Sequence, residues 1–217
     1  MEQRNLGRTG LRVSTLGFGA GAVGGLMVRG TPAEQTRAVA RALDAGITYF
    51  DTAPGYGDGR SEENLGRALR ELDAWGRGVV GTKVRLRPAD LADPIPAIRR
   101  SCEASLRRLG RDAVALIQLH NQIRGGAGGD TAASAASLPV DEVRGAVAEG
   151  LQRLVGDGLA AHVGFTGLGD ADAAAAIARD GRYATVQAYY NALNPSAGTA
   201  GAAGGGQDFA GLLATAA

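Results

Sequence analysis

Four residues of this 217-residue chain have types and positions that could move a proton to or from a substrate. Three of them end or directly follow a short apolar run, and the fourth, a tyrosine, lies between two glycines after the first of these runs. The four are Asp51, Tyr56, Lys83 and His120. Each alone has an ordinary explanation, because an aspartate can cap a turn, a lysine can lay its stem along apolar surface, and a histidine can bond a buried carbonyl.

Together the four side chains could work as a proton-transfer group. A phenol has a pKa of about 10 and exchanges protons poorly near neutrality. A lysine ammonium beside it favours the phenolate, and an aspartate can supply the counter-charge that a buried lysine needs. A histidine can orient a carbonyl and stabilise charge on its oxygen. This combination predicts protonation of an alkoxide while a cofactor delivers a hydride to carbon.

The elements that must position these residues follow a regular alternation of short apolar runs and amphipathic helical segments. Strands are expected at 16–19, 47–50, 78–83, 113–120, 162–166 and 184–190. Helices are expected at 32–45, from 61, at 94–109 and 141–156, from 170, and at 209–217. The alternation predicts a parallel sheet covered on both faces. We expect a single α/β domain over 1–217, of the (β/α)8 TIM-barrel type but incomplete, with about six of the eight βα units. A small β-hairpin at 5–13 precedes it.

The predicted strand ends carry more polar residues than chance placement would give. In a (β/α) barrel the carboxyl ends of all strands lie on one rim, where the active site is found. The residues at these ends are Asp51, Lys83, His120, Thr166 and Gln187. Five such residues at five ends favour a functional rim over five unrelated structural roles.

A glycine-rich loop at 19–24 offers a competing interpretation, because it matches GxGxxG after a strand. In a doubly wound dinucleotide fold the helix begins within that motif. Here the helix-start signal comes later, in the capping box Thr31-Pro32-Ala33-Glu34. Asp51 keeps the alternative open, since an acid after a second strand could hold a ribose.

Composition and charge narrow the function classes. The formal net charge is +1, which gives no reason to expect nucleic acid or an anionic membrane as a partner. The N-terminus lacks an apolar signal region, and no run approaches the roughly 18 apolar residues of a membrane span, so the expected compartment is the cytoplasm.

Cys102 is the single cysteine of the sequence and is expected to fill space in the core. With His120 and His162 as the two histidines, we expect no metal site, and His162 is expected to be structural. Two glycine patches, 125–129 and 198–206, are expected to be flexible loops.

Several motifs in sequence order resemble the aldo-keto reductases, from Asn5 to about Asn191. They are Asn5-Leu6-Gly7-Arg8-Thr9-Gly10-Leu11-Arg12-Val13-Ser14, Phe50-Asp51-Thr52-Ala53, Tyr56-Gly57, Ser61-Glu62, Gly66, Lys83 and Leu119-His120. The resemblance implies that Tyr56 is the general acid/base, that Lys83 and Asp51 tune it, and that His120 directs the carbonyl. A short-chain dehydrogenase, another family of reductases, would need the motif Tyr-x-x-x-Lys. No tyrosine in this sequence has a lysine four residues further on, so we discard that family.

The same resemblance implies a cofactor, NADP(H) or in some members NAD(H), bound across the barrel rim. Gln187 would bind the nicotinamide carboxamide, Tyr190 would stack on the ring, and Thr166 stands where the family usually has serine. Gly167 replaces the asparagine that often follows that serine. The implied substrate is a small carbonyl compound or alcohol.

Family members continue for two more βα units, which close the barrel and bring residues for the adenosine phosphate. The sequence up to Ala217 shows no trace of them. We therefore expect a truncated reductase with a complete catalytic group and an impaired cofactor site. Two functions stay open: an NADP-dependent carbonyl reductase or alcohol dehydrogenase, and a non-catalytic module that binds cofactor or a partner.

Overall fold

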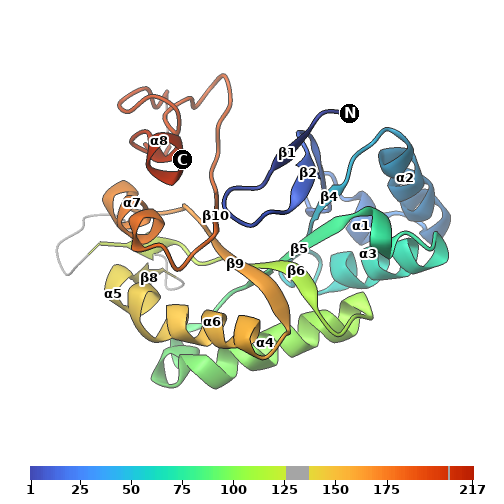
Figure 1. Cartoon of the computed structure of the whole chain (residues 1–217), viewed down its shortest axis with the longest axis horizontal. Helices are drawn as coiled ribbons and strands as arrows, with labels where there is room; N and C mark the ends of the chain where they lie inside the picture. The colour runs from blue at the N-terminus through green and yellow to red at the C-terminus, as the bar shows by residue number, and fades with distance from the viewer. Residues whose placement is uncertain (126–136, 205) are drawn as a thin grey trace.

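The centre of this computed structural model is a 6-stranded sheet in which all neighbouring strands are parallel. The structure describes residues 1–125, 137–204 and 206–217. The strands are β3 (Gly17–Gly19), β4 (Tyr49–Asp51), β5 (Val79–Val84), β6 (Val114–Leu119), β9 (Ala160–Thr166) and β10 (Thr185–Gln187). They lie side by side in sequence order, as Figure 1 shows. This order has no reversal point, so the sheet forms half of a barrel.

Sequential strand order also rules out the doubly wound alternative, in which the strand order reverses at the cofactor crevice. A four-residue helix, α1 (Leu26–Arg29), does follow the GxGxxG segment, which the sequence interpretation had not predicted. The longer helix α2 (Pro32–Asp44) begins where the capping box predicted. The Thr31 hydroxyl accepts from the Glu34 backbone N–H, and the Glu34 carboxylate accepts from the Thr31 backbone N–H.

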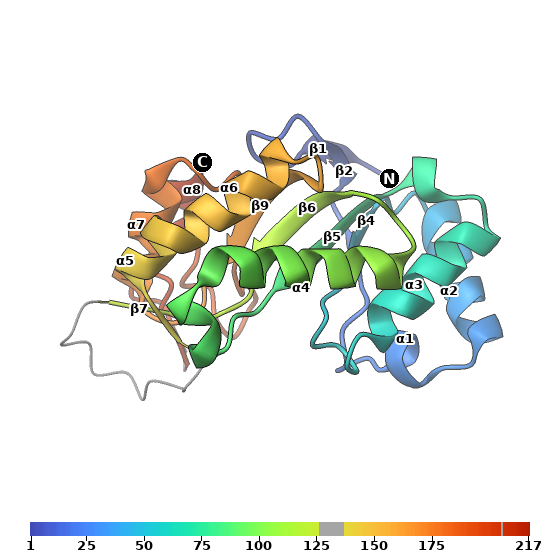
Figure 2. The ribbon, with the colours of Figure 1, turned by 90° about the horizontal axis from the view of Figure 1, so that it is seen from below.

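The other long helices also lie outside the curved sheet. They are α3 (Arg60–Glu71), α4 (Pro94–Leu109), α6 (Ala148–Gly156) and α7 (Ala171–Asp180). Figure 2 shows α4 and α6 side by side across the sheet, and α3 packs against both α2 and α4. Gly66 of α3 lets that helix approach α4 closely, because a Cβ there would collide with the Leu109 carbonyl group. Within the described residues, no helix combines the length and hydropathy needed to cross a membrane.

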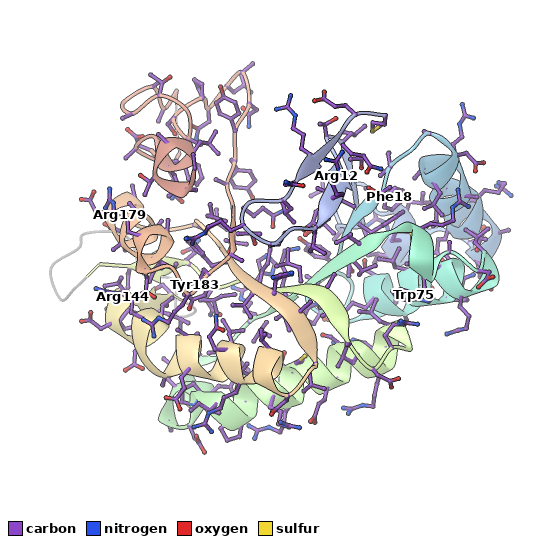
Figure 3. The ribbon with its side chains drawn as sticks, viewed as in Figure 1. Arg12, Phe18, Trp75, Arg144, Arg179 and Tyr183 are labelled. Atoms are coloured by element: carbon purple, nitrogen blue, oxygen red, sulfur yellow. The ribbon has the colours of Figure 1, made fainter. Side chains whose placement is uncertain are left out.

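The core between sheet and helices contains the apolar residues that the periodicity placed inside. Cys102 is fully buried in it, as predicted for a filler residue. Tyr183, labelled in Figure 3, belongs to this core. Its ring packs against Phe165 of β9, and its hydroxyl donates to the Val143 carbonyl at 2.8 Å.

The segment predicted as one helix at 141–156 is interrupted. It consists of α5 (Val140–Glu142), a π-helical turn (Val143–Val147) and α6. Gly145 breaks the regular backbone with φ −94° and ψ −118°. Glycine has no Cβ to exclude that conformation, so the sequence pattern alone could not distinguish this break from a continuous helix.

The remaining elements border the sheet. The predicted hairpin is present as β1 (Gln3–Asn5) and β2 (Arg12–Ser14), joined through left-handed Gly7 and Gly10. Two short strands, β7 (Ile123–Arg124) and β8 (Leu138–Pro139), pair at the ends of the predicted loop 124–139. Most of the glycine patch at 125–129 lies outside the described residues. The last helix, α8 (Leu212–Ala216), lies within the predicted 209–217, whereas β10 ends at Gln187 and is shorter than expected.

Candidate active site

A buried ion pair connects the ends of β4 and β5. The Lys83 ammonium contacts both Asp51 carboxylate oxygens, at 2.8 Å and 2.7 Å, and donates to the Thr52 carbonyl at 2.9 Å. The Lys83 side chain is 1% exposed and that of Asp51 is 15% exposed. A lysine this deep in the protein requires such a set of acceptors, because an unpaired buried charge is strongly unfavourable.

Tyr56 reaches the same ammonium from the loop after β4. Its hydroxyl oxygen lies 3.4 Å from Lys83 Nζ, and its ring meets the His120 ring edge-on with 6.0 Å between centroids. The loop is fixed locally, since Tyr56 donates its backbone N–H to Ala53 and its carbonyl accepts from the Ser61 N–H. The structure thus brings together all four residues that the sequence proposed for proton transfer.

The pKa of Tyr56 shifts in the opposite direction to the one expected from the sequence. Burial, followed by repulsion from the Asp51 charge and from Tyr189, raises it to about 12. Burial is the main cause, and the Lys83 charge does not offset it, because the ammonium is bound at 2.7 Å to Asp51. Burial also lowers the pKa of Lys83, while the Asp51 carboxylate opposes that shift.

His120 follows β6 and faces the phenol. Burial lowers its pKa to about 4, and the positive charges of Lys83 and Arg85 act in the same direction. The imidazole is therefore neutral near pH 7 and carries one N–H donor and one acceptor nitrogen. It can donate a hydrogen bond to a carbonyl oxygen without adding a positive charge to the site.

A cavity of about 170 Å³ opens beside these groups. It is lined by Tyr56, His120, Thr166, Leu168, Gln187, Ala188 and Tyr189. The Thr166 hydroxyl donates to the Leu119 carbonyl at 3.1 Å, and Gln118 donates to the Gln187 side-chain oxygen at 3.3 Å. Hydroxyl and amide groups next to an aromatic ring suit a planar ligand that carries an amide.

The cavity wall contains a second tyrosine, Tyr189, which the sequence interpretation missed. Tyr190, which was expected to stack on a ring, is not among the lining residues and packs next to Gly198. The distance along the chain from Gln187 could have pointed to Tyr189, because side chains two residues apart in an extended segment point to the same side. Gln187 and Tyr189 have this spacing.

In the described ranges, the other titratable residues do not form a second centre of this kind. Among the described residues, no group of three or more His, Cys, Asp or Glu side chains could hold a metal ion. His162 lies within β9, in register with Leu116 of β6, and is not among the residues that line the cavity.

Comparison with known proteins agrees with this fold. L-galactose dehydrogenase of Arabidopsis thaliana is 31% identical over 169 residues, which are 77% of this chain and 49% of that protein. A probable voltage-gated potassium channel subunit beta of the same species is 38% identical over 125 residues, or 55% of this chain and 37% of that protein. The chain thus spans half or less of the length of these relatives.

A solved structure shows the same fold. The aldo/keto reductase of Klebsiella pneumoniae, in complex with NADP and acetate, matches with a TM-score of 0.67 at 28% identity. The match covers 91% of this chain and 61% of that one. The sequence profile of the aldo/keto reductase family matches residues 15–200. The chain therefore belongs to the aldo/keto reductase family.

Proposed function

We propose that this protein reduces small aldehydes or ketones to alcohols with NADPH or NADH, and that Tyr56 donates the proton. The observation that carries this proposal is that a phenol and a neutral imidazole line one cavity, with the Lys83 ammonium 3.4 Å from the phenol oxygen.

The described residues fit a nicotinamide ring. The Thr166 hydroxyl and the Gln187 amide could bind its carboxamide, and Tyr189 offers a ring face in the cavity wall. Tyr190, proposed from the sequence, lies next in the chain and is not among the lining residues, although the two tyrosines are similarly exposed, at 63% for Tyr189 and 61% for Tyr190. The NADP in the Klebsiella relative supports this choice of cofactor. When bound, the reduced nicotinamide supplies the hydride that the carbonyl carbon receives.

The chain's own residues account for the proton. The His120 N–H donates a hydrogen bond to the carbonyl oxygen and holds it near the phenol. As the oxygen becomes an alkoxide, the Tyr56 hydroxyl transfers its proton to it, and the nearby Lys83 ammonium stabilises the phenolate left behind. The product is a neutral alcohol, and solvent later restores the phenol proton. The carbonyl thus gains one hydride and one proton.

The protonation state of Tyr56 suits carbonyl reduction. With a pKa of about 12, the phenol is protonated at neutral pH and ready to act as an acid. Oxidation of an alcohol would require the phenolate as base, which is scarce until the pH is strongly alkaline. We therefore expect carbonyl reduction to be the faster direction near pH 7.

Replacing Tyr56 with phenylalanine tests this proposal. The substitution removes one hydroxyl, and loss of a general acid should lower turnover of a simple aldehyde roughly 10²- to 10⁴-fold. Tyr183→Phe is the matched control, because it also removes one tyrosine hydroxyl that makes one hydrogen bond within the protein, but outside the cavity. Oxidation of NADPH measures turnover, and fluorescence quenching measures cofactor binding, which both variants should keep. Undiminished turnover in Tyr56→Phe would exclude this residue as the acid.

A second candidate is a module that binds the cofactor or a protein partner without turnover. The relative named as a probable potassium channel subunit beta supports it, since that name describes a subunit and no reaction. The same assay separates the two candidates. Quenching by NADPH without oxidation of the cofactor in the presence of several aldehydes would favour the binding module.

A further inference from the structure

Two consecutive buried polar residues, Ser61 and Glu62, lie in the first turn of α3, directly behind the catalytic group. Both are fully buried, although the helix surface around them is polar. The mechanism proposed above does not use either residue. Their contacts lead to the strand ends that hold Asp51 and Lys83, and to the loop that holds Tyr56.

Ser61 binds three segments of the rim. Its hydroxyl donates to the Ala20 carbonyl at 2.8 Å, so the Thr52 hydroxyl, also 2.8 Å away, must donate to Ser61. Its backbone N–H donates to the Tyr56 carbonyl at 3.2 Å. Thr52 matters because its own carbonyl accepts a hydrogen bond from Lys83. Ser61 thus fixes the tyrosine loop and one of the acceptors of the ammonium.

Glu62 binds the strand that holds the lysine. One carboxylate oxygen accepts from the Thr82 hydroxyl at 2.5 Å, and the other accepts from Arg108 Nε of α4 at 2.6 Å. Thr82 directly precedes Lys83 in β5, so the two side chains point to opposite faces of the sheet. Glu62 therefore holds β5 from the helix side at the residue next to Lys83.

We propose that Ser61 and Glu62 are positioning residues, which fix Tyr56, Lys83 and Asp51 relative to one another from behind the sheet. Glu62 also places a negative charge near the ammonium, across β5. This inference rests on the proposed function for its effect on turnover, but its effect on Lys83 does not depend on that function. The titratable groups that face Lys83 are Asp51, Tyr56 and His120, with Glu62 acting through the sheet.

The sequence offers an unusual probe, because Lys83 is its sole lysine. Isotope-labelled lysine would give one side-chain NMR signal that needs no assignment, in protein prepared without a lysine-containing tag. The Coulombic effect of Glu62 raises the pKa of Lys83. In Glu62→Gln we therefore expect the titration midpoint of that signal to move to lower pH. Asp180→Asn is the control. Like Glu62, Asp180 has a carboxylate paired with arginine, in this case with two arginines, but it lies on α7.

A second pair of variants separates positioning from simple loss of stability. Thr82→Val removes the hydroxyl that donates to Glu62 but keeps the side-chain volume, while Thr82→Ser keeps the hydroxyl. We expect Thr82→Val to change the Lys83 signal and to lower kcat for aldehyde reduction roughly 10- to 100-fold. Thr82→Ser should recover most of both. This pair also decides the matter if Glu62→Gln does not fold.

The outcomes are distinct. If Glu62→Gln and Thr82→Val lower the melting temperature but leave the Lys83 signal as in the wild type, the two residues only support the fold and the inference is wrong. If the wild-type protein oxidises no NADPH with any aldehyde while the Lys83 signal responds as expected, the proposed function fails and the positioning role stands.

Discussion

The buried pair of Asp51 and Lys83 allows a quantitative prediction that needs no cofactor. Asp51→Asn removes the counter-charge and leaves the ammonium with neutral acceptors, which are the Asn oxygen, the Thr52 carbonyl and the Tyr56 hydroxyl. Lys83 is 1% exposed, so water cannot replace the lost carboxylate. Removal of one partner from such a pair costs roughly 3–5 kcal/mol of unfolding free energy. For a chain of this length the melting temperature should fall by about 6–20 °C.

The reverse substitution should cost less. Lys83→Met keeps the length of the side chain and leaves Asp51 without its cation, but that carboxylate is 15% exposed and can take up water or a proton. We expect a loss of roughly 1–3 kcal/mol, the range for a polar group left without its partner. In the double variant neither charge remains, so its cost should be smaller than the sum of the single costs by about 2–3 kcal/mol.

Urea unfolding of the four proteins, followed by far-ultraviolet circular dichroism at pH 7, measures this coupling. The control is the exposed pair of Arg153 and Glu149 on α6, whose side chains are 60% and 55% exposed. A cycle of that pair should give roughly 0.3–0.5 kcal/mol. If the Asp51 and Lys83 costs simply add, the two charges do not stabilise one another and the account of the site given above is refuted.

Three further predictions concern glycine packing and titration. Gly66→Ala should destabilise the protein by roughly 1–3 kcal/mol or more, because the new methyl group meets the backbone of Leu109. Gly76→Ala is the control, since open space surrounds Gly76, and it should change the stability in urea little. Equal effects of the two substitutions would contradict the close approach of α3 to α4. The difference in tyrosinate absorbance between the wild type and Tyr56→Phe should stay flat through about pH 10, since the pKa of Tyr56 is about 12; ionisation below that pH would contradict it. The folded-state pKa of His120 is lowered to about 4 from 6.5, so its contribution to stability is complete above pH 6.5 and is lost as the pH falls towards 4. After allowance for its partial exposure, the wild type should lose roughly 1–2 kcal/mol more than His120→Gln over that interval, and parallel urea curves for the two proteins would argue against a buried neutral imidazole.

The sequence was sufficient to predict the rim because strand ends can be recognised locally. An apolar run followed by Asp51, or ended by Lys83, marks both a buried strand and the residue that emerges from it. The capping box at Thr31 and the stop at Gly46 are equally local, since each depends on the conformation of a few neighbouring residues. Strand order then followed from the alternation of strands and helices, which leaves few topologies open.

Features that depend on distances between separate elements could not be predicted in this way. The direction of the Tyr56 pKa shift depends on how deeply the phenol is buried and on how close Asp51 lies to it. Likewise, Glu62 reads as an acid in the first turn of a helix, a position that is usually solvated. Its burial becomes visible only when α4 brings Arg108 against it.

The arrangement of the ion pair has a consequence for the proposed reaction. In the resting protein the Lys83 charge is held by Asp51, so little of its attraction is used on the neutral phenol. When Tyr56 gives up its proton, the phenolate that forms 3.4 Å from Lys83 Nζ gains an attraction that the phenol lacked. An interaction that strengthens only as charge develops lowers the barrier, whereas one already complete in the ground state does not. In the proposed reaction, burial thus keeps the phenol protonated, and the Lys83 charge acts mainly once the phenolate forms.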